Sequence, residues 1–171
     1  MRTSGWIVFA CAITMFTWGD LAAQQDTPPD SVRLYGLTDA SSIAGGVVIP
    51  AGRSVVWTSG TGPPLFNERA QPGTQERFGD TKIQAEGVLR RIEEQLGDLG
   101  LALGDVVYIR AYLVPDPQLG GIDTAGWNEA FQEVFGTPTN PTRPARSTIG
   151  VAALVNPDWL IEVEAFAVYP E

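Results

Sequence analysis

Apolar residues at helical spacing mark the middle of the chain as an amphipathic helix. Between residues 83 and 99 apolar side chains keep near-helical spacing, and charged residues occupy much of the remaining surface. The apolar residues are Ile83, Val88, Leu89, Ile92, Leu96 and Leu99. The sequence Thr-x-x-Gln over residues 81–84 fits a capping box that starts a helix, and Gly97 or Gly100 can end it. We expect this helix to pack on a sheet through its apolar face.

A second helix is predicted between residues 123 and 136. Asp123 or Thr124 can cap its first turn, and Gly136 can stop it. Its apolar face is mainly aromatic: Trp127, Phe131, Val134 and Phe135. Aromatic residues at this spacing are more often core than ligand site, so we expect them to pack in the core.

Alternating or β-branched segments on either side of the first helix predict strands. Three of them, at residues 32–37, 43–50 and 53–58, precede it, and Pro-Ala-Gly at residues 50–52 predicts a hairpin between the second and third. Residues 59–64 form a turn-rich loop. Residues 105–113, which follow the helix, predict a buried strand.

The last part of the chain predicts two strands around an Asn-Pro-Asp turn at residues 156–158. Residues 148–155 are apolar on both sides of a strand, which predicts cover on both faces, and residues 161–167 place acids on one face. Pairing the two strands as a hairpin puts Glu162 opposite about Ala152 and Arg146 opposite about Val168. That register separates Arg146 from Glu162 by roughly 20 Å.

The order of these elements is β-β-β-α-β-α-β-β. Helices on one face of a mixed sheet define a two-layer α+β domain, and the length suits a single domain. The N-terminal segment is different: a basic Arg2, an apolar run and small residues before Gln24 predict a signal peptide at residues 1–23. Residues 24–31 are a polar, proline-bearing lead-in to a domain at 32–171. An uncleaved anchor is the alternative, although the apolar run is short for a membrane span.

The net charge and the residue composition exclude several kinds of binding and catalysis. Net charge is −9 and stays −9 without the signal peptide, which opposes binding to nucleic-acid phosphates and anionic membranes. Histidine is absent, Cys11 lies inside the signal peptide, and Lys82 is the sole lysine. Thiolate, histidine-base and histidine-rich zinc chemistry are therefore excluded from the mature chain.

Arginine and carboxylates remain as candidates. Arg146 enters the strand from the proline-stiffened Pro144, and a guanidinium there matches a carboxylate ligand. A surface salt bridge is the alternative. Glu162 and Glu164 either meet solvent or have partners, since a dry unpaired carboxylate is costly.

Several of these motifs together resemble the reactive intermediate deaminase family, RidA/YjgF. They are Pro-Ala-Arg-Ser at residues 144–147, Ile-Glu-Val-Glu-Ala at 161–165, Trp-Thr-Ser-Gly at 57–60, residues 84–100 as a first helix, and a second helix with Asn128, Phe131 and Phe135. The resemblance runs from about residue 47 to residue 168.

The resemblance implies a chorismate-mutase-like fold, a trimer with sites between subunits, and cofactor-free hydrolysis of imines or enamines such as 2-aminoacrylate to keto acids and ammonia. By motif position Arg146 would hold the substrate carboxylate and Glu162 would orient or activate the attacking water. Backbone at Ser59, Gly60 and Thr148 would line the pocket, with Asn128 nearby. We expect an exported, periplasmic or secreted, member.

Two departures from the family pattern keep other functions open. Residues 43–48 contain no tyrosine where the deaminase branch has a Gly-Pro-Tyr-like segment, and Thr148 stands at a position that is often cysteine. One alternative is a trimer that binds a small carboxylate without turnover. The other is a ribonuclease, which the acidic charge and the absence of histidine oppose.

Overall fold

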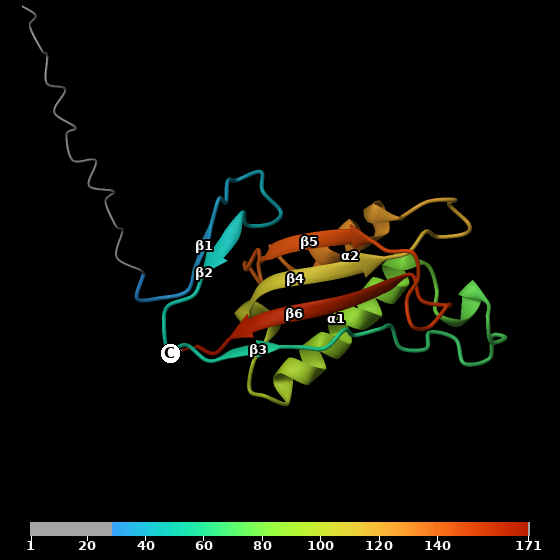
Figure 1. Ribbon diagram of the computed structural model, residues 1–171, viewed down its shortest axis with the longest axis horizontal. Coiled ribbons are helices and arrows are strands. Elements are labelled where there is room, and N and C mark those ends of the chain that lie inside the picture. The colour runs from blue at the N-terminus through green and yellow to red at the C-terminus, as the bar shows by residue number, and fades with distance from the viewer. Residues whose placement is uncertain (1–28, 171) are drawn as a thin grey trace, which may run out of the picture.

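The computed structural model describes residues 29–170. The predicted signal peptide and most of the lead-in lie outside them. The main unit is a four-stranded mixed sheet in the order β3-β6-β4-β5, with both helices on one face (Figure 1). Its elements are β3 (Val55–Trp57), α1 (Thr81–Gly97), β4 (Val106–Leu113), α2 (Thr124–Val134), β5 (Ala145–Gly150) and β6 (Ile161–Val168). The predicted α+β class and element order are confirmed.

The first helix begins one residue earlier than the capping box predicted. Asp80 is the N-cap, and its carboxylate accepts a hydrogen bond from the Ile83 amide at 2.9 Å. The capping box was wrong because an aspartate one position upstream takes the capping role. The buried Gln84 side chain instead accepts from the Leu160 amide at 2.7 Å and donates to the Gly79 carbonyl at 3.0 Å, which ties α1 to the segment before β6.

The end of α1 also differs slightly from expectation. The helix stops at Gly97, and Gly100 adopts a positive φ of 75° that favours glycine. Leu99 was expected on the apolar face, but it lies beyond the helix and is 49% exposed.

The second helix agrees with prediction. Asp123 caps it by accepting from the Gly126 amide at 2.9 Å. Trp127 and Phe131 are fully buried. Lys82 joins the two helices through ion pairs to Glu129 at 2.9 Å and Glu133 at 2.8 Å on α2. None of the helices described between residues 29 and 170 is long and apolar enough to cross a membrane.

Strand pairing overturns the predicted hairpin at residues 50–52. β1 (Arg33–Tyr35) pairs with β2 (Gly46–Val48) in a separate antiparallel ribbon beside β5, whereas β3 pairs antiparallel with β6 (Figure 1). The ribbon touches the sheet through a bridge between Ala44 and Ala145. Alternation of apolar residues identified the strands, but it carried no information on which strands are neighbours.

The predicted C-terminal hairpin is also wrong. β5 runs parallel to β4, with α2 as the crossover, and β6 pairs antiparallel with the other edge of β4. β5 ends at Gly150, so the predicted strand at residues 148–155 is mostly loop, and Val155 is 93% exposed. The prediction of cover on both faces therefore fails for this segment within the protomer.

The sheet has two unlike faces. The face toward the helices supplies the core with residues that alternate along each strand: Val106, Ile109, Ala111, Leu113, Ile161, Val163, Ala165 and Ala167. The opposite face is not covered by any described helix. It carries Trp57, which is 59% exposed and packs on Phe166 with ring centroids 4.3 Å apart, and the Arg110–Glu164 ion pair at 3.3 Å.

Candidate functional site

Arg146 lies near the start of β5 on the helix side of the sheet. Its partner in the ladder is Ile109, a core residue, so its side chain leaves the sheet toward α2. There its Nη2 donates to Asn128 Oδ1 at 2.6 Å. Its guanidinium carbon lies 4.5 Å from the centroid of the Phe131 ring and 5.4 Å from that of Trp127. Three residues of α2 thus form a seat for one guanidinium.

The charge of Arg146 has no anionic partner within the described chain. Across residues 29–170 no carboxylate lies within 4 Å of its guanidinium, so the salt-bridge alternative is wrong there. Partial burial lowers the pKa of Arg146 from its ordinary value because desolvation disfavours the charged form. An arginine stays protonated at neutral pH even so. The result is a half-buried cation with hydrogen-bond donors left over, which can bind a carboxylate.

Thr148 lies two residues along β5 and therefore on the same face as Arg146. Its Oγ1 accepts a hydrogen bond from Trp127 Nε1 at 3.0 Å. The structure thus brings three of the predicted site residues together, Arg146, Asn128 and Thr148. Asn128 contacts the arginine itself, so it holds Arg146 in place.

A second cluster forms at the other edge of the sheet. Glu162 pairs with Tyr112 in the ladder, which puts it on the open face. Its carboxylate lies directly over Gly60, where a Cβ would collide with Oε1. Residue 60 must therefore be glycine for Glu162 to keep this position. Ser59 precedes it, and its carbonyl accepts from Thr61 Oγ1 at 3.3 Å.

These two clusters do not meet within one protomer. Arg146 and Glu162 lie on opposite faces of the sheet, with β4 between their strands. Their ladder partners, Ile109 and Tyr112, are three residues apart, so the two positions differ by about 10 Å along the strands and about 10 Å across them. The hairpin register behind the earlier separation of roughly 20 Å was wrong, but the conclusion that one small ligand cannot bridge the pair in a protomer stands.

The neighbouring acid, Glu164, has a different role. It forms an ion pair with Arg110 at 3.3 Å, and its side chain is 19% exposed. The sequence left two alternatives for each acid, contact with solvent or contact with a partner. Glu164 has a partner. Between residues 29 and 170 the structure gives Glu162 no ion pair.

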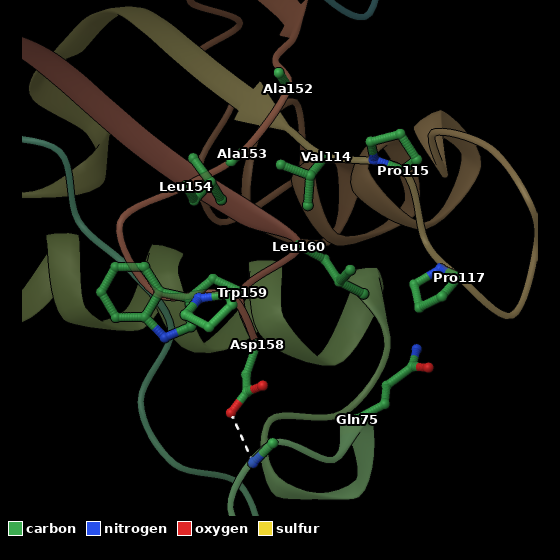
Figure 2. Close-up of a pocket in the computed structure, with 12 residues that line it drawn as sticks. Gln75, Val114, Pro115, Pro117, Ala152, Ala153, Leu154, Asp158, Trp159 and Leu160 are labelled. Carbon is green, nitrogen blue, oxygen red and sulfur yellow. Dashed lines mark hydrogen bonds between the residues drawn. The ribbon is translucent and has the colours of Figure 1, made fainter.

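The sequence did not predict a cavity at the end of the sheet where β4 stops and β6 starts. Its volume is about 370 Å³, and Figure 2 shows it among Val114, Leu154, Leu160 and Gln75. Asp158 at its rim accepts from the Gly73 amide at 3.1 Å. The only sequence signal was a recurrence of prolines in loops that are far apart in the chain. None of the predicted site residues lines this cavity.

The fold and these clusters define a small α+β protein without a His or Cys nucleophile among its described residues. The sequence model of the family described as Endoribonuclease L-PSP matches residues 48–169. The chain belongs to this family, known also as RidA/YjgF, so the resemblance found in its motifs is confirmed.

Individual relatives support the same assignment. A RutC family protein of Pyrococcus abyssi is 38% identical over 89 residues, which cover 52% of this chain and 62% of that relative, so less than two thirds of the relative is matched. The Rid protein YyfB from Yersinia pestis is 29% identical over 81% of this chain and 99% of its own, with a TM-score of 0.55. The crystal structure of TdcF from E. coli with bound serine is 27% identical over 76% of this chain and 96% of its own, with a TM-score of 0.52.

Proposed function

We propose that this protein hydrolyses reactive imines or enamines that carry a carboxylate, of the 2-aminoacrylate type, to keto acids and ammonia. The observation that carries the proposal is Arg146, a half-buried guanidinium on an aromatic seat with no carboxylate partner among residues 29–170. A half-buried cation of this kind gains most from a ligand that supplies the missing carboxylate. TdcF, a relative, has been crystallised with serine, a small molecule that bears a carboxylate.

The site is proposed to lie between neighbouring subunits of a homotrimer. Arg146 is on β5, one edge of the sheet, and Gly60 follows β3 at the other edge. A neighbour that brings its β3 edge to this β5 edge would place its Glu162 near Arg146. The open face supports association, because it exposes Trp57 and Ile149 by 59% and 41%.

The reaction needs few groups from the protein. Water adds to the carbon of the C=N bond, a proton moves to nitrogen, and the C–N bond breaks to leave the keto acid and ammonia. The substrate is already electrophilic, so Arg146 would anchor its carboxylate and Glu162 would orient the water and accept its proton. Backbone groups at Ser59, Gly60 and Thr148 would line the cleft. No cofactor has a step in this scheme.

Replacement of Arg146 tests the proposal. Arg146→Ala should lower kcat/KM for a freshly generated imine by about 30- to 1000-fold, the value of a bidentate pair worth roughly 2–4 kcal/mol. Arg146→Lys should recover little, since an ammonium cannot present two parallel donors. The exposed Arg90 on α1 provides the control, and Arg90→Ala should keep full activity. Full activity of Arg146→Ala, with the oligomer intact, would refute the assignment.

A binding protein without turnover is the second candidate. It is favoured by the absence of a tyrosine in residues 43–48. Ligand-induced stabilisation by pyruvate without imine hydrolysis by the purified protein would select this candidate. The family description names an endoribonuclease, but a net charge of −9 and the absence of histidine oppose RNA cleavage here.

The location of the protein is also proposed as periplasmic or secreted. The proposal depends on the order of basic, apolar and small residues in the first 23 positions. Mass spectrometry of the purified native protein should find an N-terminus near Gln24. Recovery from the cytoplasm with Met1 attached would contradict export.

A further inference from the structure

Two adjacent residues of α2 bind two alternate residues of β5. Trp127 donates to Thr148 at 3.0 Å, and Asn128 accepts from Arg146 at 2.6 Å. Thr148 and Arg146 lie on the same face of β5, two positions apart. The helix therefore holds this stretch of strand at two neighbouring points, one of which is the proposed substrate-binding arginine.

The attachment has a mechanical reason. β5 is an edge strand, and along residues 146–150 it has ladder partners only on β4 among the described residues. Its other edge is held within the described protomer only at Ala145, by the bridge to Ala44, and residues 146–150 have no strand partner on that side. A small rotation of β5 would swing the long side chain of Arg146, because a displacement at the backbone grows toward the guanidinium. The Trp127–Thr148 hydrogen bond opposes that rotation.

Trp127 also contacts the guanidinium of Arg146 through its ring. Its ring lies 5.4 Å from the guanidinium carbon of Arg146, and it packs edge-on against Phe131 with centroids 5.6 Å apart. Phe131 in turn lies 4.5 Å from the same guanidinium carbon. One fully buried tryptophan thus touches the strand, the ring under the cation and the cation itself.

We propose that Trp127 is a positioning residue for carboxylate recognition, which holds Arg146 at a fixed angle through its hydrogen bond to Thr148 and its contact with the guanidinium. This inference rests on the proposed function of Arg146. It assigns to the hydroxyl of Thr148 a task separate from that of its backbone, which was expected to line the cleft. Neither residue touches the reacting atoms in this scheme.

The test compares a carboxylate with its uncharged ester. Dissociation constants for pyruvate and methyl pyruvate are measured by calorimetry on the purified oligomer. Thr148→Val keeps the shape of the exposed threonine but removes the acceptor, and it should reduce the preference for pyruvate over its ester about 3- to 10-fold, the range of one hydrogen bond. Thr148→Ser retains a hydroxyl and should keep the wild-type preference. Trp127→Phe removes the donor and should act in the same direction as Thr148→Val.

The outcomes separate positioning from structural support and from failure of the site. If Thr148→Val weakens the binding of pyruvate and of methyl pyruvate equally, or weakens neither, the preference is unchanged and the positioning role is wrong. Arg146→Ala is measured in parallel and should abolish the preference. If Arg146→Ala retains the preference, Arg146 is not the carboxylate receptor, and the proposed function fails with this inference. If Arg146→Ala loses the preference while Thr148→Val keeps it, only the inference fails.

Discussion

The same strands supply side chains to both faces of the four-stranded sheet, but the two faces serve different purposes. Along β4, Ile109 and Ala111 point to the helices and are fully buried, while Tyr108, Arg110 and Tyr112 point the other way and are partly exposed. On the helix side packing is complete within the protomer. On the open side aromatic rings and an ion pair stay in contact with solvent.

The difference between the two faces separates residues that stabilise the fold from residues that are available for function. The helix face buries enough apolar surface to hold the domain together, so the main contribution of its residues is to stability. The open face gains little from folding alone, and its exposed aromatic residues become useful only against another molecule. Arg146 is the exception on the helix face, since it places a charge beside the core at the edge strand.

The largest effect should come from Glu162, one of the two acids of the open face. Glu162→Gln should lower kcat for imine hydrolysis by roughly 100-fold or more, since a general base is lost, while the dissociation constant for pyruvate changes little. Glu164→Gln is the matched control: it lies two residues along the same strand, keeps its volume and should retain turnover. Equal losses in both variants would show that the face, and not Glu162, is responsible.

The next largest effect should be on the free energy of unfolding, which should respond differently to substitutions on the two faces of the sheet. Ile109→Ala should lower the free energy of unfolding by about 2–5 kcal/mol, because it leaves a cavity between the sheet and the helices. Val55→Ala, at a position 55% exposed on the open face, should change it by about 0.5 kcal/mol or less. Urea unfolding of both variants at the same protein concentration provides the measurement. A large loss for Val55→Ala would mean that Val55 itself is buried in the assembled protein, so that its part of the open face contributes to stability.

The smallest effect on the protomer should come from Trp57→Ala. The side chain is 59% exposed and packs on one side only, against Phe166, so the protomer should keep its circular dichroism spectrum. Association should weaken, because large aromatic residues dominate interfaces. Sedimentation velocity at micromolar concentration compares the variant with the wild type. An unchanged trimer, or a wild type that sediments as a monomer, would contradict the proposed assembly.

The sequence predicted local structure well because local signals were strong. Helical spacing, the cap at Asp123 and the β-branched and aromatic residues within 105–113 gave both helices and the central strand. Partner choice among strands failed, because the partners lie far apart in the sequence: β5 pairs with β4 across the α2 crossover, and β3 pairs with β6. Short β-rich segments on either side of a proline turn look like hairpins whether or not they pair.

The candidate site followed the same division. The motif identified Arg146 and Glu162, yet their placement on opposite faces depends on β4 lying between β5 and β6, which no local pattern encodes. The aromatic seat was visible as a helical stripe and was correctly assigned to the core. Its second role under a guanidinium became apparent only with the strand in place.

The position of β6 has a consequence for the order of events during synthesis. β6 is the last described strand to leave the ribosome, yet it lies between β3 and β4, which have no ladder contact with each other. Until residues 161–168 are made, β3 has no neighbour in the sheet, and the core between sheet and helices lacks Ile161, Val163, Ala165 and Ala167. Long-range pairing of this kind slows folding. A nascent chain of this protein should therefore stay open to proteases and chaperones until β6 has left the ribosome.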